Sequence, residues 1–199
     1  MSKNNEDIKV KKIKKVYQGY NNINSYEFKH RLFDSSWSKT LKREMIITKE
    51  CCCLLPYDKK NNLILLIKQF RIGAYLARTS PWQIEVIGGS KEVSEIDPKI
   101  TIQREAYEEA SLRVQYNKLK KIRTVLNSSG ITNEKTIIYF SHSDLSKTKG
   151  VFGNKLENED IKVLKLKPKE AFSMVKKGKI NSVNTIIALD WLEKNMKNV

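Results

Sequence analysis

Three glutamates lie close together in residues 105–109. Glu105, Glu108 and Glu109 follow the spacing i, i+3 and i+4, which places their side chains on one face of an α-helix. Carboxylates held this close repel each other unless a cation neutralises them. Hard oxygen ligands of this kind suit Mg²⁺ or Mn²⁺, and these ions suit phosphate-bearing substrates. The spacing alone leaves a solvated acidic helix face open as the alternative.

A helix is predicted to carry these carboxylates. Asp97 is a favourable N-cap, and Pro98 follows at the first helical position. Ile102, Ala106 and Ala110 then recur at i, i+4 and i+8, which predicts one apolar stripe along the helix. The three glutamates therefore lie beside the face that packs on the core.

This segment and the glycines before it resemble the signature of the Nudix hydrolases. That signature is a Gly, five residues, a Glu, seven residues, and then Arg-Glu-U-x-Glu-Glu-x-Gly-U, where U is aliphatic. Gly89, Glu95 and the run REAYEE at 104–109 match it, with two departures. Eight residues separate Glu95 from Arg104, and we expect the loop before the helix to absorb the extra one. Ser111 replaces the last Gly and is expected to end the helix less favourably.

The resemblance extends over nearly the whole chain. Within the superfamily, the chain is most similar to one branch, the bacterial ADP-ribose diphosphatases. It is carried by residues 32–46, 54–75, 150–163 and 178–192, and it is weakest before residue 25. It implies hydrolysis of ADP-ribose to AMP and ribose 5-phosphate with Mg²⁺, for which Mn²⁺ could substitute. It also implies the Nudix fold, an α/β/α sandwich with a mixed sheet, and a homodimer formed through the N-terminal region.

The resemblance assigns roles to residues of the signature. The metal ligands would be Glu105, Glu109 and the backbone carbonyl of Gly88. Glu108 would be a further ligand, direct or through water. Arg104 would orient the carboxylates by charge-assisted hydrogen bonds, and a helix-surface salt bridge is its alternative role.

The resemblance also implies that the catalytic base comes from a loop after the signature. The matching acidic run is 156–160, which follows Gly150 and Gly153. We choose Glu157 as the base that deprotonates or orients water, with Glu159 as a metal-linked alternate. Without the resemblance, this run is an exposed acidic loop.

Four more positions match substrate contacts of this branch. Arg71 matches a position that reaches the phosphates, where an Arg can bind in a bidentate manner. Glu85 and Glu134 match polar positions on the substrate side. Arg43 is expected near the adenosine end, in its own site or in the partner subunit's site. Residues 127–131 read Asn-Ser-Ser-Gly-Ile where the family usually has Ser-Pro-Gly-Gly, which leaves the details of substrate recognition open.

Strands and helices alternate along the chain. Strand-like runs are predicted at 45–55, 63–69, 82–87, 122–126, 136–140 and 161–166, and closing helices at 168–177 and 183–196. Gly88-Gly89 is expected to end the third run. This order favours an α/β fold, a mixed sheet with helices on both faces. We assign residues 1–44 to an N-terminal strand arm or small subdomain for dimerisation, and 45–199 to the hydrolase domain.

Composition limits the class of protein. The 199 residues carry 38 basic and 22 acidic side chains, a formal net charge of +16. Only seven of the basic residues are Arg and the Lys residues are spread along the chain, which disfavours a nucleic-acid-binding surface. The longest apolar runs, such as 63–67 and 186–189, are too short to span a membrane, and no secretory signal is visible. We expect a soluble cytoplasmic protein without a membrane partner.

Cysteine chemistry is not expected to contribute. Cys51, Cys52 and Cys53 are consecutive, and neighbouring side chains of a strand point to opposite faces, so they cannot form a structural zinc site. We expect them to be buried, reduced core residues.

Three alternatives to an ADP-ribose diphosphatase stay open. The first is a GDP-mannose or other nucleotide-sugar diphosphatase of the same superfamily. The second is a Nudix-fold binding module without catalysis, and the third is an RNA-binding protein. A pure binding module has no need of five retained glutamates, Glu105, Glu108, Glu109, Glu157 and Glu159.

Overall fold

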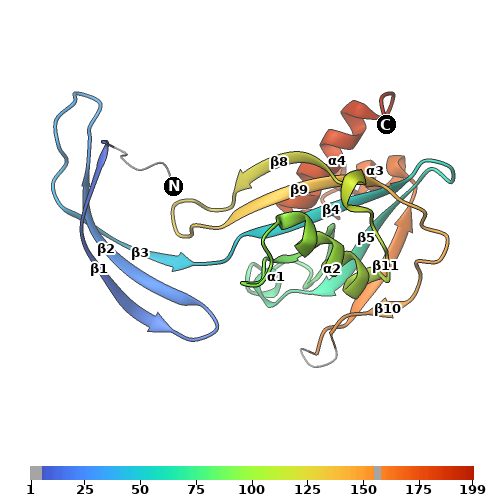
Figure 1. Cartoon of the computed structure of the whole chain (residues 1–199), viewed down its shortest axis with the longest axis horizontal. Helices are drawn as coiled ribbons and strands as arrows, with labels where there is room; N and C mark the ends of the chain where they lie inside the picture. Colours follow the sequence, from blue (N-terminus) through green and yellow to red (C-terminus); the bar gives the residue numbers. More distant parts are fainter. Residues whose placement is uncertain (1–5, 155–157) are drawn as a thin grey trace. The chain divides into compact units, whose positions relative to one another are not determined.

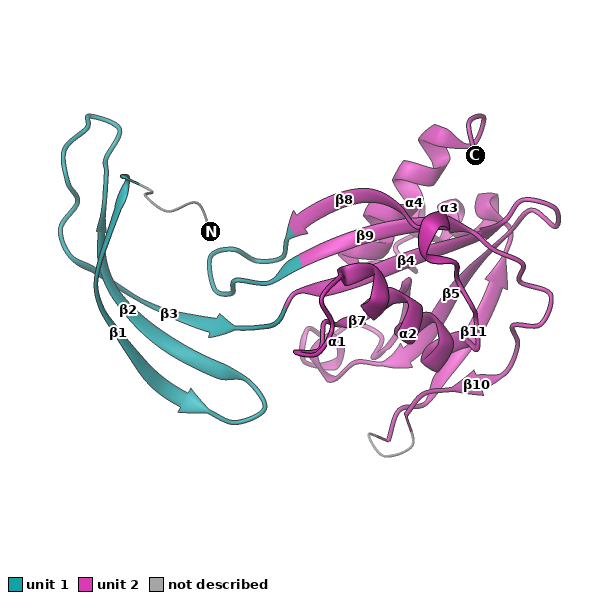
Figure 2. Cartoon of the chain, viewed as in Figure 1, with its two compact units in different colours: residues 1–49, 126–135 teal, residues 50–125, 136–199 magenta. Residues whose placement is uncertain are grey.

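The computed structural model describes residues 6–154 and 158–199 and divides the chain into two compact units. The first comprises residues up to 49 together with residues 126–135, and the second comprises residues 50–125 and 136–199 (Figure 2). The first unit thus contains the predicted arm, residues 45–49 and one distant loop.

Three antiparallel strands in the order β1-β2-β3 form the first unit (Figure 1). These are β1 (Ile8–Gln18), β2 (Asn22–His30) and β3 (Leu41–Ile47). Ile8, Val10 and Ile13 of β1 pair with alternate residues of β2, so they share one face, where they are 42%, 49% and 57% exposed. The first unit therefore carries an exposed apolar row.

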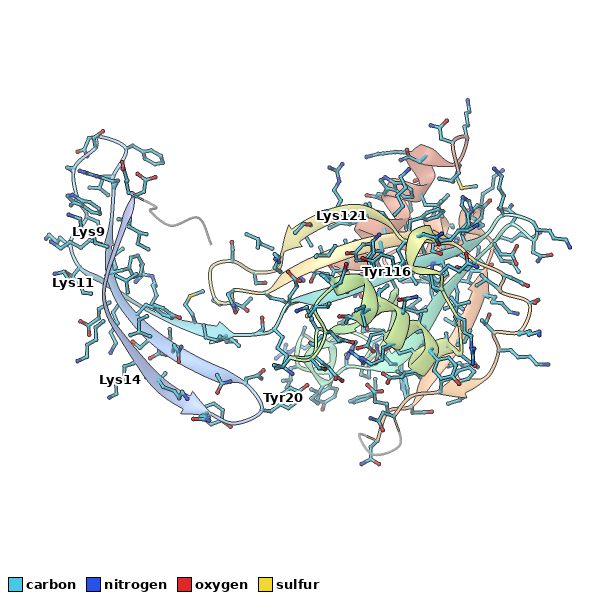
Figure 3. All side chains as sticks on the ribbon, in the orientation of Figure 1. Lys9, Lys11, Lys14, Tyr20, Tyr116 and Lys121 are labelled. Atoms are coloured by element: carbon cyan, nitrogen blue, oxygen red, sulfur yellow. The ribbon has the colours of Figure 1, made fainter. Side chains whose placement is uncertain are left out.

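The lysines of β1 lie along the same strand. Figure 3 labels Lys9, Lys11 and Lys14 on it. The Lys9 ammonium lies 4.3 Å from the centre of the Trp37 ring, and Lys11 Nζ donates to Thr40 Oγ1 at 3.0 Å. Two of these three lysines thus bind groups of their own unit.

The loop at 126–135 joins the first unit through bonds to β3. The Ile46 N–H donates to the Ile131 carbonyl at 2.8 Å, and the Thr48 N–H donates to Asn133 Oδ1 at 2.8 Å. The Asn133 N–H in turn donates to the Ile46 carbonyl. These contacts end β3 and explain why residues far apart in the sequence form one unit.

An eight-stranded mixed sheet runs through the second unit in the order β10-β11-β5-β4-β9-β8, with β6 paired to β5 and β7 paired to β4. Its strands are β4 (Cys51–Asp58), β5 (Leu63–Phe70), β6 (Trp82–Glu85), β7 (Ile87–Ser90), β8 (Lys120–Leu126), β9 (Lys135–His142), β10 (Val151–Phe152) and β11 (Ile161–Leu166). The β4–β9 pair is parallel, and β4–β5, β4–β7, β5–β6, β5–β11 and β10–β11 are antiparallel.

Helices cover both faces of this sheet, which confirms the α/β fold with a mixed sheet (Figure 1). Helix α2 (Pro98–Ala110) packs on the face to which Leu54 points, and α3 (Pro168–Lys176) and α4 (Val183–Asn195) pack on the face to which Leu55 points. The short helices α1 (Ile72–Leu76) and η1 (Tyr116–Lys118) complete the set. Within the described residues, no helix is long and apolar enough to cross a membrane.

The predicted glutamate-bearing helix is confirmed as α2. Asp97 is its N-cap and accepts from the Lys99 N–H at 2.8 Å. Ile102, Ala106 and Ala110 are fully buried, as their spacing predicts. Tyr116, on η1 and labelled in Figure 3, donates from its hydroxyl to Asp97, which attaches the start of the helix to η1.

The prediction of one strand over residues 45–55 is wrong. The run divides at 48–50 into β3 and β4, which belong to different sheets. The Thr48 N–H bonds to the Asn133 side chain instead of a strand partner, so the backbone leaves the first sheet there. The sequence of an apolar run does not reveal where the strand changes from one neighbouring strand to another.

The prediction that Gly88-Gly89 ends the third run is also wrong. Both glycines belong to β7, where Gly88 pairs with Cys53 and Gly89 with Cys52. A Cβ at Gly88 would lie 2.7 Å from the Cys52 carbonyl oxygen, so glycine allows the two backbones to approach. The break comes earlier, at Val86, between β6 and β7.

The three cysteines alternate across β4, as expected, and none of these described residues forms a disulfide. Only Cys52 is fully buried, whereas Cys51 and Cys53 are partly exposed. The prediction of burial is therefore right for Cys52 and too strong for its neighbours. Burial, with the charge of Glu50 nearby, raises the pKa of Cys52 to about 12.

Candidate active site

Helix α2 presents its glutamates to different environments. Glu109 is only 4% exposed and the Glu105 side chain is 12% exposed, because both lie one turn apart beside the buried stripe. The Glu108 side chain is 46% exposed. The predicted acidic face is thus a pair of carboxylates, Glu109 buried and Glu105 nearly buried, with a third carboxylate at its rim.

Strand β7 lies directly against this pair. The Gly88 N–H donates to Glu109 Oε2 at 3.0 Å. A Cβ at Gly89 would overlap the carboxylate of Glu105. The two glycines therefore allow both carboxylates to reach the strand backbone.

Arg104 connects the carboxylates to the loop before the helix. Its Nη1 lies 2.9 Å from Glu105 Oε1 and 3.0 Å from Glu108 Oε2. Its Nε donates to Glu95 Oε1 at 3.0 Å, and its Nη2 donates to the Ser90 carbonyl at 3.2 Å. Because one planar guanidinium makes all these bonds, its position fixes those of the helix, β7 and the loop together.

Glu95 has a role that sequence reasoning missed. Its Oε2 accepts from Thr101 Oγ1 and from the Glu92 N–H, each at 2.8 Å. Burial would raise the pKa of Glu95, but the bonds from Arg104, the Glu92 N–H and Thr101 outweigh it and lower the pKa below its usual value. Glu95 is therefore a charged hydrogen-bond acceptor that holds Arg104 in place. In the sequence, only its position in the signature indicated this role.

The extra residue of the signature was expected directly before the helix, near Ile96 and Asp97. Val93 is 95% exposed and Ile96 is 90% exposed. An added residue next to Ile96 lengthens this exposed part of the loop without displacing core side chains.

Nearby positive charges compensate the two carboxylates only in part. Burial, together with the charges of Glu108 and Glu159, raises the pKa of Glu105 to about 7 against the opposing effect of Arg104. Burial, with Glu105 and Glu159, raises the pKa of Glu109 well above its usual value, and the Gly88 N–H and Arg71 only partly oppose this. An added cation would lower both values.

The donor set fits a hard divalent cation. Glu105 and Glu109 are anionic oxygen donors of the kind that Mg²⁺ and Mn²⁺ prefer. Across residues 6–154 and 158–199, no three His, Cys, Asp or Glu side chains form a ready-made metal site.

The acidic loop contributes Glu159, whose charge acts on both buried carboxylates. The Asn154 N–H donates to Glu159 Oε2 at 3.0 Å. Gly153 has φ +114°, and a Cβ there would lie 2.7 Å from the Glu159 Cβ, so this position requires glycine. Glu157, our choice for the base, lies outside the described residues.

Arg71 and Glu85 form a pair. Arg71 Nε donates to Glu85 Oε2 at 2.9 Å, and Gln69 Nε2 donates to the same oxygen at 3.2 Å. The Arg71 side chain is 49% exposed, and its charge lowers the pKa of Glu109, so it lies within electrostatic reach of the carboxylates. The structure thus brings these two predicted substrate residues together.

Arg43 and Glu134 belong to the first unit. Arg43 lies on β3, and its Nη1 donates to the Lys42 carbonyl at 2.8 Å. Glu134 Oε1 accepts from Asn127 Nδ2 at 2.8 Å across its own loop. Their assignment to the substrate stays a prediction.

Curated relatives match most of the chain, whereas no protein-family model does. ADP-ribose pyrophosphatase of Escherichia coli (strain K12) is 34% identical over 187 residues, which cover 94% of this chain and 88% of that protein. ADP-ribose pyrophosphatase of Haemophilus influenzae is 33% identical over 193 residues, 96% of this chain and 88% of that protein. GDP-mannose pyrophosphatase of Escherichia coli O1:K1 is 30% identical over 154 residues, 76% of this chain and 78% of that protein.

A solved structure shares the fold over nearly the whole length. The crystal structure of an ADP compounds hydrolase superposes with a TM-score of 0.73 and covers 98% of this chain and 97% of its own, at 14% identity. Together with identities above 30% over most of both sequences, these findings show that the chain belongs to the ADP-ribose pyrophosphatase family of Nudix hydrolases.

Proposed function

We propose that this protein hydrolyses the diphosphate bond of ADP-ribose to give AMP and ribose 5-phosphate. The observation that supports this most is the buried pair Glu105 and Glu109 beside the glycines of β7, with raised pKa values that a cation would relieve. The two relatives named ADP-ribose pyrophosphatase indicate which diphosphate the site takes.

Nudix ADP-ribose pyrophosphatases are generally metal-dependent. Here Glu105, Glu109 and the Gly88 carbonyl would hold Mg²⁺, or Mn²⁺ in its place, with Glu108 as a further ligand directly or through water. When bound, the ion neutralises the diphosphate and makes its phosphorus more electrophilic. Arg104 orients the Glu105 and Glu108 carboxylates for this role through its bonds at 2.9 and 3.0 Å.

The remaining steps are assigned to the other predicted site residues. Arg71 binds the diphosphate through its guanidinium, and Glu85 orients Arg71 by accepting from its Nε. Glu157 takes a proton from the attacking water, with Glu159 as the metal-linked alternate. Arg43 would contribute near the adenosine end, in its own site or in the partner subunit's site, and Glu134 would be a polar group on the substrate side.

The GDP-mannose pyrophosphatase relatives support a second candidate, GDP-mannose hydrolysis. They match a smaller share of the chain, 76% against 94%, at lower identity. We therefore rank GDP-mannose below ADP-ribose as the substrate.

Product analysis tests this proposal. The purified chain is incubated with ADP-ribose, GDP-mannose and other nucleotide sugars, with and without Mg²⁺ or Mn²⁺. We expect AMP and ribose 5-phosphate from ADP-ribose only when the metal is present. Glu105→Gln and Glu109→Gln should each lower turnover at least about 100-fold, and the surface variant Glu193→Gln should not. Faster hydrolysis of GDP-mannose, or normal turnover in both site variants, would contradict the proposal.

We also propose that the protein is a cytoplasmic homodimer assembled through its first unit. The exposed row of Ile8, Val10 and Ile13 supports this, because a three-stranded sheet with apolar side chains open to water gains stability from a partner. None of the three cysteines, all of them among the described residues, forms a disulfide, which suits a reducing compartment.

A further inference from the structure

Residues 82–90 run as two strands that pair with different neighbours. In β6, Glu85 pairs with Ile67 of β5, whereas in β7, Ile87 pairs with Leu54 of β4. Val86 lies at the change of partner and belongs to neither ladder. Because Val86 is only 4% exposed, its N–H needs an acceptor from elsewhere in the protein.

That acceptor is a side chain of α4. The Val86 N–H donates to Thr185 Oγ1 at 3.0 Å, between residues 99 positions apart in the sequence. Thr185 is fully buried, in the first turn of the helix. Its hydroxyl therefore replaces the strand partner that the backbone loses at this point.

Both halves of the candidate site are attached to this short segment. Glu85, the residue before Val86, accepts from Arg71 at 2.9 Å. Gly88, two residues after it, donates its N–H to Glu109 at 3.0 Å. A shift of the Val86 peptide would therefore move Glu85 and Gly88 together.

We propose that Thr185 is a positioning residue for the reaction, which acts through the Val86 peptide on Glu85 and Gly88. The effect of Thr185 on the rate rests on the proposed hydrolysis of ADP-ribose. The hydroxyl fixes where the strand changes partner, and so fixes the spacing between the Arg71–Glu85 pair and the Glu109 carboxylate. Misplacement of such groups by a fraction of an ångström lowers rates strongly without unfolding the protein.

Three substitutions separate the hydroxyl from the packing of the side chain. Thr185→Val keeps the volume and removes the acceptor, and Thr185→Ala removes the acceptor without adding a methyl group. Thr185→Ser keeps the hydroxyl. Leu192→Val is the matched control, because Leu192 is fully buried on the same helix and is not part of the Val86 contact.

Kinetics and metal binding are the first measurements. Thr185→Val and Thr185→Ala should lower kcat/KM for ADP-ribose at least about 10-fold. They should also weaken Mn²⁺ binding to the substrate-free protein by about 10-fold, measured by titration calorimetry. Thr185→Ser and Leu192→Val should stay within about threefold of the wild type in both assays.

Amide hydrogen exchange is the second measurement and does not depend on the substrate. Thr185→Val should speed exchange of the Val86 and Gly88 amides at least about 10-fold, while the amides of α2 keep the wild-type rate. A wild-type protein inactive on ADP-ribose would contradict the proposed function alone, because Mn²⁺ binding and exchange still report on Thr185. The Thr185 proposal is overturned if Thr185→Val and Thr185→Ala match Leu192→Val in these measurements, or if Thr185→Ser loses as much as Thr185→Val.

Discussion

At the scale of single residues, Arg104 and Glu95 show how the signature works as a physical unit. Arg104 is 25% exposed and binds Glu95, Glu105 and Glu108 at 2.9 to 3.0 Å. The charge-assisted bonds to the little-exposed Glu95 and Glu105 contribute about 1.5–3 kcal/mol each, whereas the i,i+4 pair with Glu108, whose side chain is 46% exposed, contributes about 0.3–0.5 kcal/mol. A lysine has no planar fork with which to repeat this geometry.

Substitutions in the acidic loop and at Arg71 should affect different steps. Glu157→Gln should lower kcat by roughly 10²–10⁴ with little change in substrate affinity, since a base acts mainly in the transition state. Glu159→Gln should cause a milder loss that excess Mg²⁺ partly restores. Arg71→Ala should raise KM instead, because it removes a phosphate contact and leaves Glu105 and Glu109 in place. Steady-state kinetics on ADP-ribose across a Mg²⁺ series measures all three.

A Glu157→Gln enzyme with wild-type kcat would refute the assignment of the base. The search would then move to Glu159, whose charge already acts on Glu105 and Glu109. An Arg71→Ala enzyme with unchanged KM would leave Arg71 as a partner of Glu85 only.

Residue types could be predicted from the sequence, but most partners could not. The spacing of Glu105 and Glu109 showed that they share a helix face, because helical periodicity is local. The Arg71–Glu85 bond joins residues 14 positions apart on different elements, so no local pattern contains it. Glu95 matched the signature only by position, and its bond to Arg104 became visible in the fold.

At the scale of elements, α2 ends at a C-cap residue, Ser111, that is less suited than glycine to the backbone conformation there. Ser111 is the C-cap and has φ 49° and ψ 31°, the left-handed conformation that glycine adopts without a steric cost. Ser111→Gly should therefore raise the free energy of unfolding by about 0.5–1 kcal/mol, measured by urea denaturation, with turnover unchanged. Ser111→Ala is the control and should give no such gain, because alanine keeps the Cβ.

The accuracy of the predicted elements depends on what their patterns encode. The helix at 98–110 combined a cap, a proline and a regular apolar stripe, and it was found as predicted. The strand breaks at 48–50 and at Val86 were missed, because apolar residues continue on both sides while the partner strand changes. Periodicity reports which face of a strand is buried, not which strand lies beside it.

At the scale of the whole molecule, the buried carboxylates link stability to pH and metal. Glu105 has a pKa of about 7 in the folded metal-free protein and 4.5 as its ordinary value. Between these values the folded state binds more protons than the unfolded state, so stability should fall as pH rises from about 4.5 to about 7. Differential scanning calorimetry should show this fall, and Glu105→Gln should reduce it.

Bound Mg²⁺ should reverse this fall in stability at higher pH, because the cation takes the place of the proton on the Glu105 carboxylate. Mg²⁺ should raise the unfolding temperature more at about pH 8 than at about pH 5. The lowered pKa of Glu95 acts below this window. Burial and nearby lysines lower the pKa of His142 from 6.5, which opposes the fall below about pH 6.5, so the comparison with Glu105→Gln isolates the contribution of Glu105. An unfolding temperature that Mg²⁺ changes equally at both values of pH would contradict this account.

Assembly is a second property of the whole molecule. Light scattering at micromolar concentration should give twice the chain mass of 23.1 kDa. Ile13→Lys should shift the mass toward the monomer, because it places a charge in the exposed apolar row. Lys14→Gln, which changes the opposite face of β1, should leave the mass unchanged. A monomer mass for the unaltered protein would exclude the dimer.

Long-range assembly was the least predictable part of the structure. Residues 126–135 join the first unit through bonds such as Thr48 to Asn133, which are 85 positions apart. The sequence placed these residues in a loop of the larger domain, since nothing near them encodes a partner so distant. Local sequence patterns do not encode which distant segments come into contact, so such contacts could not be predicted from composition or periodicity.

The close approach of Gly89 to Glu105 restricts which amino acids an active protein can carry at position 89. The carboxylate occupies the volume that any side chain at position 89 would need, so every other amino acid must displace Glu105. Gly73, by contrast, has nothing within 4 Å of where its Cβ would lie. A saturation library scored for activity should therefore accept one residue at position 89 and many at position 73. Active variants with alanine at 89 would show that Glu105 can move and still serve the reaction.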